Sequence, residues 1–529
     1  MAKQKLSDLK FDKWSNGLIK INEENSQKMK DLLDSTGPGF CLAKWTQVTM
    51  HLGVGLTHSC HHPGAHKIPL EELEKNPSAL HNTEFKKQRR KEMLAGERPA
   101  ECDFCWRIED NTQEFSDRVY KSLDAFSINE HDLITEMTGS EDIFPKYVEV
   151  SFNNVCNFKC SYCGPTFSSK WVEEIKQHGS YKFLNNDAFN EVTDVQIKER
   201  EDNPYTTAFW KWFPEAVTHM HTFRITGGEP LLSKHTMRVV DYLIENPQPE
   251  LEFAINSNGN PPQAIWDEFV KKVSDLVNSG CIKKFTLFTS AESVGPAAEY
   301  SRFGMEWDRF EKNIVALMDS SKKINVTIMA AFNILSLTTF TDLLKWTLEL
   351  KRKYNRSPFF AWIEESDVSC EPIVHYGSDE NSLINRREPS VANSVRINID
   401  IPYVRNPKFL DCNIASMQLI EQLLLPAVDF MYKNAAHDDW DATLGFNQWE
   451  AAKLKRIFVD VLCEVKDARN SDETTTNKSI SKQRSDFYEF VNEYDRRRKT
   501  NFLDTFPEMQ QFYNLCELEY FKIQEQLNQ

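Results

Sequence analysis

The 529-residue sequence contains no run of about 20 apolar residues, which is the length that a membrane-spanning helix needs. Its first residues, MAKQKLSDLKFDKW, include lysines but no apolar segment of the kind found in secretory signals, so we expect a cytoplasmic protein without a membrane partner. Basic residues are in deficit as well: 63 Lys and Arg stand against 79 Asp and Glu, a net charge of −16. Binding to duplexes is driven by the release of counterions from phosphates, so this balance disfavours nucleic acid as a partner.

The longest basic runs, at 86–91 and 496–499, fall in segments with a helical pattern. We expect both to be solvated charged faces, because Lys and Arg are seldom fully buried. Neither run by itself indicates a function.

The sequence also has no internal repeat and no sustained heptad pattern. From about residue 147 onward, strand-like and helix-like segments alternate. The apolar runs that predict strands are 147–152, 221–226, 251–256, 284–289, 325–330 and 359–363. Strands that alternate with helices are typical of βαβ units with a parallel sheet, either open or curled into a barrel. The predicted fold class is therefore α/β.

The chain is predicted to have five parts. They are an N-terminal arm (1–35), a cysteine-containing module (36–112), the α/β domain (146–370), an irregular connection (371–411) and a helical C-terminal domain (412–529). Within the cysteine-containing module we expect a hairpin over 40–60 and a basic helix over 70–94.

Cysteine is the most informative residue type. A cytosolic chain of this size is not expected to form disulfides, so clustered cysteines indicate metal or redox chemistry. Seven of the twelve lie in the first third of the chain: Cys41, Cys60, Cys102, Cys105, Cys156, Cys160 and Cys163.

The last three of these form a CxxxCxxC motif directly after the predicted strand at 147–152. Ligands of α/β proteins bind at the carboxyl ends of the parallel strands, which is where these thiols fall. Three thiolates on a four-iron cluster leave one iron open to a substrate or cofactor. Structural zinc is the alternative, but it requires four ligands, and no fourth ligand lies nearby in the sequence.

The motif resembles that of the radical S-adenosylmethionine superfamily, CxxxCxΦC with an aromatic residue at Φ, here Tyr162. The segment Ile225 to Pro230 is similar to the GGEP box of that family. The resemblance covers about 146–363 and implies a partial six-stranded βα barrel. It further implies a [4Fe–4S] cluster on Cys156, Cys160 and Cys163 that binds S-adenosylmethionine and cleaves it reductively to a 5′-deoxyadenosyl radical.

The resemblance also implies the residues that contact the cofactor: Tyr162, Gly227, Gly228, Glu229, Asn256, Ser257, Ser290, Glu292 and Arg302, with Asn333 a weaker correspondence. Glycines at 227 and 228 would let the backbone approach the methionine amine. Glu229 either accepts a hydrogen bond from that amine or braces its own turn. Tyr162 either stacks near adenine or packs the cysteine loop.

The four N-terminal cysteines have a spacing of their own. Thirteen residues separate Cys41 from Gly55, four more separate Gly55 from Cys60, and Cys102 and Cys105 form a CxxC pair. This resembles the auxiliary-cluster module of SPASM and twitch radical enzymes, although here it precedes the barrel and lacks the longer SPASM series. The resemblance implies a second, auxiliary [4Fe–4S] cluster; structural zinc on the same thiols is the alternative. The histidines near Cys60, namely His58, His61, His62 and His66, are expected to be exposed polar groups rather than ligands.

The sequence thus leads to the hypothesis of a radical enzyme that abstracts hydrogen from a peptide or protein, or else from a small molecule. Such an enzyme needs a reductant such as flavodoxin or ferredoxin. Two alternatives stay open: a zinc-containing binding protein without catalysis, and a radical enzyme that modifies nucleic acid.

Overall fold

The computed structural model describes residues 5–13, 19–183, 197, 202–355, 395–436, 444–470 and 475–528. The chain divides into two compact units. Unit 1 comprises Met1–Val155, Asp194–Asn256 and Lys271–Thr286. Unit 2 comprises Cys156–Thr193, Ser257–Val270 and Leu287–Gln529. Each of the two cysteine groups predicted to bind a cluster therefore lies within a single unit.

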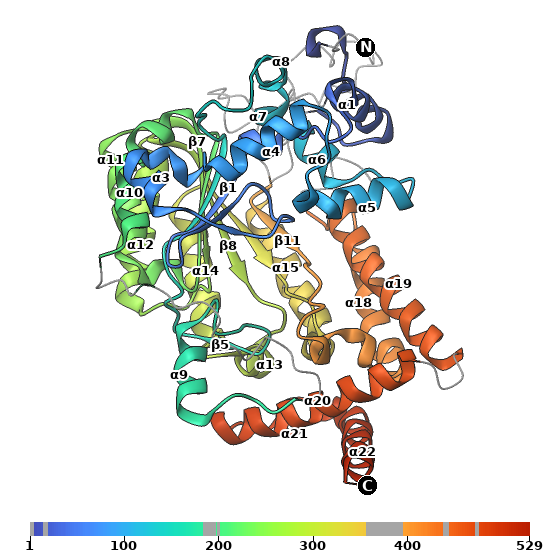
Figure 1. Cartoon of the computed structure of the whole chain (residues 1–529). Helices are drawn as coiled ribbons and strands as arrows, with labels where there is room; N and C mark the ends of the chain where they lie inside the picture. Colours follow the sequence, from blue (N-terminus) through green and yellow to red (C-terminus); the bar gives the residue numbers. More distant parts are fainter. Residues whose placement is uncertain are drawn as a thin grey trace, which may run out of the picture. The chain divides into compact units, whose positions relative to one another are not determined.

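Unit 1 is built on a largely parallel sheet (Figure 1). Its neighbouring strands are, in order, β7 (Gln248–Ser257), β6 (Thr222–Thr226), β4 (Tyr147–Ser151), β1 (Gln47–His51), β2 (Leu56–His58) and β3 (His66–Lys67). The first four run parallel, and β2 and β3 are antiparallel additions. This pairing confirms the predicted α/β class, and the β1–β2 pair confirms the predicted hairpin.

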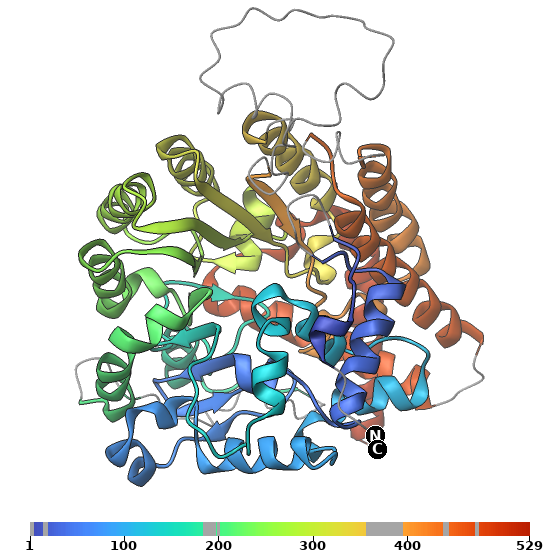
Figure 2. The same cartoon turned by 90° about the horizontal axis from the view of Figure 1, so that it is seen from above.

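Strand alternation gives this sheet one apolar and one polar face. Val148 of β4 pairs with Phe223 of β6, and Glu149 pairs with Arg224. Since successive side chains of a strand point to opposite faces, the apolar pair faces the helices and the charged pair faces away from them. The covering helices are α10 (Pro204–Ala216) and α11 (Lys234–Glu245), drawn in green outside the strands in Figure 2. Phe209 and Phe213 of α10 both contact the Phe223 ring.

The strand β8 (Ile282–Ser290) runs from unit 1 into unit 2. Unit 2 also contains β10 (Ile324–Met329) and β11 (Ile397–Asp400), which pair in parallel. The predicted strand at 359–363 lies outside the described residues. The sequence pattern did not predict β11, which falls in the stretch expected to be irregular. Pairing with β10 and burial of its two isoleucines stabilise this short strand, and neither is visible in local sequence.

The helix predicted over 70–94 is interrupted. It is divided into α3 (Leu70–Lys75), the 3₁₀ turn η2 (Pro77–Leu80) and α4 (Glu84–Leu94). Asn76 caps η2 by accepting a hydrogen bond from the Ser78 N–H, and Thr83 caps α4 by accepting one from the Lys86 N–H. Two N-caps within eight residues start two new elements, so one continuous helix cannot form.

Three whole residues of the two basic runs are buried, so the expected solvated faces are wrong at these positions. They are Lys86, Arg90 and Arg498. The Lys86 ammonium donates to Thr57 Oγ1 at 3.0 Å, and Arg90 donates to Asn82 Oδ1 at 2.8 Å. Polar partners supplied by the fold replace the water that a charged side chain loses on burial.

The C-terminal part of unit 2 is helical. Its longer helices are α18 (Leu425–Lys433), α19 (Gln448–Asn470), α20 (Thr475–Arg498) and α22 (Gln510–Leu527), drawn in orange and red in Figure 1. Aromatic contacts such as Tyr488 with Tyr520, at 5.2 Å between ring centroids, join α20 to α22. Among the helices of the described ranges, none combines the length and the apolar character of a membrane span.

Candidate metal centres and cofactor site

The CxxxCxxC segment forms a compact loop in unit 2. Cys160 lies on the two-residue strand β5 (Lys159–Cys160), which pairs antiparallel with β9 (Arg302–Phe303). Cys156 and Cys160 are buried and Cys163 is half-buried. The Cys163 N–H donates to the Cys160 carbonyl at 3.1 Å, which closes a tight turn between the last two cysteines. The structure thus brings the three predicted cluster ligands together in one loop.

The electrostatics of this loop suit a metal cluster. Burial raises the pKa of the Cys163 thiol, and the charges of Cys160 and Cys156 raise it further. Burial also raises the pKa of Cys160, against the opposing effect of Arg302. Three thiolates this close repel one another unless cations neutralise them, and a bound iron–sulfur cluster does so. The donor set therefore fits the predicted [4Fe–4S] cluster.

Three residues predicted to contact the cofactor form a polar group beside this loop, also in unit 2; Glu292 and Arg302 are buried and Tyr162 is half-buried. The Tyr162 hydroxyl donates to Glu292 Oε2 at 3.2 Å, and Arg302 Nη1 lies 3.3 Å from the same oxygen and donates to the Tyr162 hydroxyl. Within the described residues, Glu292 Oε1 and Arg302 Nε are buried without a hydrogen-bond partner. An unsatisfied buried polar atom costs about 1–3 kcal/mol, so these two atoms are suited to hold polar groups of a ligand.

Protonation in this group follows from its burial. Burial raises the pKa of Glu292, and the neighbouring Arg302 opposes that rise. Burial alone would lower the pKa of Arg302, but the charges of Cys160, Tyr162 and Glu292 outweigh it, so the guanidinium stays charged. Burial also raises the pKa of Tyr162, which keeps its hydroxyl protonated as a donor. A fixed cation therefore lies beside the cysteine loop.

The glycine-rich turn of the GGEP segment lies in unit 1, against the residues that precede Cys156 in the chain. A Cβ at Gly227 would lie 2.7 Å from the Asn153 carbonyl oxygen, and one at Gly228 would lie 2.5 Å from the Val155 carbonyl oxygen. The Glu229 N–H donates to the Val155 carbonyl at 2.7 Å. Backbone contact between two turns therefore requires both glycines.

The Glu229 side chain is buried and braces its own turn. Its Oε1 accepts a hydrogen bond from the Leu231 N–H at 3.1 Å. This hydrogen bond corresponds to the bracing role, one of the two roles that the sequence left open for Glu229.

The polar turn after β7 supports the cysteine loop. Within unit 2, Asn258 Nδ2 donates to Asn157 Oδ1 at 2.8 Å, and Asn157 Nδ2 donates to the Asn260 carbonyl at 2.8 Å. Ser257 Oγ accepts a hydrogen bond from the Gly259 N–H at 3.1 Å. In unit 1, Asn256 Oδ1 accepts one from Arg224 Nε at 2.8 Å. The contacts within unit 2 order the turn that follows Ser257 against the cysteine motif.

The remaining predicted residues differ in their roles. Ser290 ends β8 and is half-buried. Asn333 is fully buried and forms a capping box with Ser336 at the start of η7 (Ile334–Ser336), so its side chain has a local structural role.

The four N-terminal cysteines line one cavity in unit 1, although they come from four different segments. Cys41 precedes α2 (Ala43–Thr46), Cys60 follows β2, Cys102 ends η3 (Ala100–Cys102) and Cys105 lies in α5 (Asp103–Asn111). Burial raises the pKa of Cys41, and the charges of the other three raise it further. Four thiols converging on one cavity fit either a cluster or a zinc ion.

A buried lysine lies among these thiols. Lys44 forms an ion pair with Glu101 and is 3% exposed. Burial would lower the pKa of Lys44, but the charges of Cys102 and Glu101 raise it, so the ammonium stays charged. This cation offsets part of the negative charge that four thiolates would bring.

The nearby histidines only partly match the expectation of exposed groups. His61 is exposed, whereas His58, His62 and His66 are half-buried. The Nε2 atoms of His61 and His62 lie 3.3 and 2.8 Å from Asp117 Oδ2, so these three side chains could hold a metal ion. His62 and Asp117 also line the cysteine cavity.

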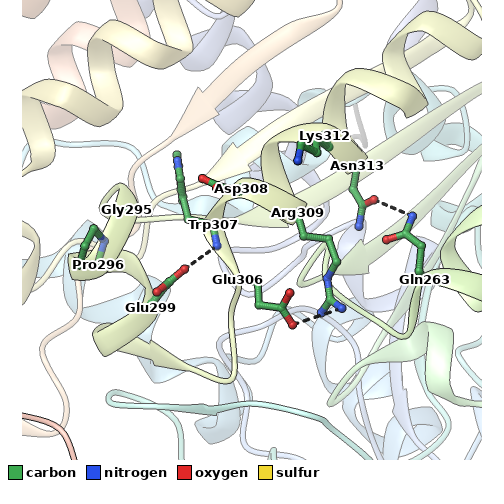
Figure 3. Close-up of a pocket in the computed structure, with 10 residues that line it drawn as sticks. All are labelled: Gln263, Gly295, Pro296, Glu299, Glu306, Trp307, Asp308, Arg309, Lys312 and Asn313. Atoms are coloured by element: carbon green, nitrogen blue, oxygen red, sulfur yellow. Dashed lines mark hydrogen bonds and ion pairs between the residues drawn. The ribbon is translucent and has the colours of Figure 1, made fainter.

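A cavity of about 600 Å³ in unit 2 contains none of the predicted site residues (Figure 3). Several of its charged and polar groups are paired with one another. Arg309 Nη1 lies 3.3 Å from Glu306 Oε1, and the Trp307 N–H donates to Glu299 Oε1 at 2.9 Å. The lining residues come from separate helices, so no sequence motif marks this cavity.

Sequence reasoning also missed Glu174 and Arg498, which contact the cysteine loop directly. Arg498 donates to the Lys159 carbonyl at 2.7 Å and to Glu174. The two partners are separated by 324 positions, and Arg498 belongs to a run that was expected to be solvated. The sequence contains no signal for this contact.

Comparison with known proteins adds distant relatives. No protein-family model matches the chain. The GTP 3′,8-cyclase of Yersinia pestis is 24% identical over 203 residues, which is 38% of this chain and 51% of that protein. The GTP 3′,8-cyclase of Nautilia profundicola is 26% identical over 132 residues, which is 24% of this chain and 31% of that protein. The chain thus spans about half the length of the first relative and about a third of the second.

The described residues thus form a parallel α/β sheet with a loop of three cysteines after one of its strands. Together with the cysteine motif, the similarity to GTP 3′,8-cyclases supports the radical S-adenosylmethionine superfamily. It is consistent with an enzyme of that superfamily.

Proposed function

We propose that the protein is a radical S-adenosylmethionine enzyme in which Cys156, Cys160 and Cys163 hold the catalytic [4Fe–4S] cluster. The observation that carries the proposal is the loop of three thiols beside Glu292, whose buried Oε1 has no partner among the described residues. The chemistry that the cluster and S-adenosylmethionine supply when bound is reductive cleavage to methionine and a 5′-deoxyadenosyl radical that abstracts hydrogen from a substrate.

The chain's own residues bind and orient the cofactor, and they exclude water from the site. Tyr162 and Arg302 hold Glu292 in place, and its free oxygen accepts hydrogen bonds from hydroxyl groups of the cofactor. Gly227 and Gly228 form the turn that we assign to the methionine end. Burial of the loop keeps water from the reacting groups, which protects radical chemistry. The fold that we propose around this site is a partial six-stranded barrel.

We further propose that Cys41, Cys60, Cys102 and Cys105 hold an auxiliary [4Fe–4S] cluster in a twitch-like module. Their convergence on one cavity supports four-thiolate coordination. Four thiolates close the coordination of a cluster, and this suits electron transfer. Structural zinc is the competing occupant, and metal analysis separates the two.

The proposed substrate is a peptide or protein, because the N-terminal cysteine pattern resembles that of SPASM and twitch enzymes. A small molecule is the second candidate, and the names of the two relatives make GTP the first nucleotide to assay. Flavodoxin or ferredoxin is the proposed reductant.

The central test is cofactor cleavage by the full chain after anaerobic reconstitution with iron and sulfide. We expect 5′-deoxyadenosine when the wild type receives a reductant and S-adenosylmethionine, and none from Cys160→Ala. Cys281→Ala is the matched control, because Cys281 is also buried but lies outside both cysteine groups. A colourless wild type that binds zinc and forms no 5′-deoxyadenosine would instead identify a zinc-binding protein. Salt-dependent binding of RNA or DNA would favour a nucleic-acid substrate.

A further inference from the structure

A buried ion pair joins helix α20 to helix α9 (Ser169–His178) within unit 2. Arg498, the last residue of α20, donates through Nε and Nη2 to the two carboxylate oxygens of Glu174, at 3.0 and 3.1 Å. The Arg498 side chain is 0% exposed and that of Glu174 is 2% exposed. Paired hydrogen bonds between a guanidinium and a carboxylate fix geometry as well as charge.

The same guanidinium reaches the backbone that carries a proposed cluster ligand. Arg498 Nη1 donates to the Lys159 carbonyl at 2.7 Å, and Trp171 Nε1 of α9 donates to the Cys160 carbonyl at 2.9 Å. Both carbonyl groups of β5 are therefore held by side chains from two helices. Cys160 cannot shift without breaking one of these hydrogen bonds.

The end of α20 is itself anchored, so the position of Arg498 is well defined. Asp495 accepts hydrogen bonds from the Tyr300 hydroxyl at 3.0 Å and from the Phe502 N–H at 2.7 Å. The guanidinium of Arg498 stacks 3.7 Å from the Tyr494 ring centroid. Lys499 then takes a left-handed conformation, with φ of 57°, and ends the helix.

The charges around Cys160 leave an excess of positive charge. Lys159 Nζ shares the Glu174 carboxylate with Arg498, at 2.6 Å, so two cations face one anion. Arg302, which pairs with Cys160 across β5 and β9, has its own counter-ion, because its Nη1 lies 3.3 Å from Glu292 Oε2. A buried cation beside an iron–sulfur cluster favours the reduced state, because that state carries one more negative charge.

We infer that Arg498 is a positioning residue of the catalytic cluster: it holds the β5 backbone that carries Cys160, and its buried charge raises the reduction potential of the cluster. The inference rests on the proposed function. It gives the C-terminal helix α20 a part in the active site that the cysteine motif does not predict.

The test compares R498Q, R498K and the matched control R496Q in the reconstituted full chain. Arg496 lies two residues away, pairs with Glu493 and has a side chain that is 60% exposed. The readouts are iron retained per chain during a chelator challenge and the midpoint potential from a dithionite titration followed by electron paramagnetic resonance. Circular dichroism reports folding.

For R498Q we expect a lower midpoint potential. The equilibrium constant for reduction of the cluster should fall about tenfold, which corresponds to about 59 mV for one electron. R498K keeps the charge but cannot hold both Glu174 and the Lys159 carbonyl, so its potential stays close to wild type while iron is lost faster. R496Q matches the wild type in both measurements.

A folded R498Q protein with the potential and iron retention of R496Q would overturn the inference. If R498Q does not fold, R498K decides: iron retention equal to that of R496Q would likewise overturn it. Failure of the proposed function looks different, because the wild type itself would then show no [4Fe–4S] signal.

Discussion

Gly228 shows how a single residue is selected by a neighbouring turn of the chain. A Cβ at this position would lie 2.5 Å from the Val155 carbonyl oxygen and 2.6 Å from that of Asn154. Backbone atoms cannot rotate aside as a flexible side chain can. The glycine is therefore needed for folding of the turn, whatever ligand approaches it.

We expect Gly228→Ala to lower the free energy of unfolding by about 1–3 kcal/mol, the usual cost of overpacking. Chemical denaturation of the purified variant measures this loss. Gly64→Ala is the matched control, because nothing lies within 4 Å of a Cβ at Gly64. If both variants were as stable as the wild type, the close contact of Gly228 with the Val155 and Asn154 carbonyl groups would be contradicted.

A change of Glu292 should weaken binding of the cofactor and leave the cluster in place. Glu292→Gln keeps the shape of the side chain and removes its charge. Hydrogen bonds to a charged group contribute about 1.5–3 kcal/mol, so we expect S-adenosylmethionine to bind about 10- to 100-fold more weakly to the reconstituted protein. Equilibrium dialysis measures the affinity, and iron analysis confirms the cluster.

The control is Glu306→Gln, which changes a carboxylate that is 65% exposed in the separate cavity of Figure 3. Wild-type affinity in Glu292→Gln, with a full complement of iron, would remove Glu292 from the cofactor site.

Helical elements differ from their sequence pattern where side chains of other segments intervene. In α4, the buried Lys86 and Arg90 face Thr57 and Asn82 rather than solvent. In α20, the buried Arg498 likewise faces Glu174 rather than solvent. A basic run on a helix thus has two faces, and only the tertiary structure determines which of its members are buried.

The ion pair between α9 and α20 predicts a pH dependence. Burial would raise the pKa of Glu174, but Arg498 and Lys159 outweigh it and lower that pKa to about 2, below its ordinary value of 4.5. A carboxylate with a depressed pKa in the folded state stabilises the fold above its unfolded pKa and loses that effect as the pH falls through the folded value. The stabilisation should therefore be complete near neutral pH and decline between about pH 5 and pH 2.

Thermal unfolding of Glu174→Gln and wild type at several pH values tests this expectation. The variant should be less stable at pH 7, and the difference should shrink as the pH approaches 3. Glu173→Gln, which changes a side chain that is 62% exposed, should show no such convergence. A constant difference between Glu174→Gln and wild type at all pH values would contradict the assigned ion pair.

At the scale of the whole molecule, the two cysteine groups belong to different compact units. Each group has its own set of thiols within one unit, so neither needs the other to complete its ligands. Loss of one group should therefore leave the other able to bind metal.

We expect about eight irons per reconstituted wild-type chain, from two cubanes. The triple variant with Cys156, Cys160 and Cys163 changed to Ala should retain about half of these irons. The double variant Cys102→Ala/Cys105→Ala should also retain about half. The latter variant should still cleave S-adenosylmethionine but not turn over the true substrate. Cys516→Ala, at a buried cysteine of α22, is the control for cysteine loss as such.

Because metal binding and folding are linked, circular dichroism must show that the N-terminal double variant is folded. A folded double variant that retains the loop cluster but cannot cleave the cofactor would refute the proposed division of roles. A triple variant that lost all iron and bound zinc would refute the auxiliary cluster.

The sequence by itself determined the α/β class, the hairpin before Cys60 and the positions of most strands, because these follow from local alternation and from turn residues. It also indicated the cysteine loop at 156–163 and the Cys102–Cys105 pair, since these ligands lie at short spacings in the sequence. For Tyr162, Glu292 and Arg302 it named candidates, but it did not show that they contact one another.

Only the tertiary structure decided which distant residues meet. The strand β11 needs β10 as a partner, and the convergence of Cys41 with Cys105 needs the intervening helices. The contact of Arg498 with the cysteine loop closes a separation of more than 300 residues. Such contacts depend on long-range burial and pairing, which a local pattern of residues does not encode.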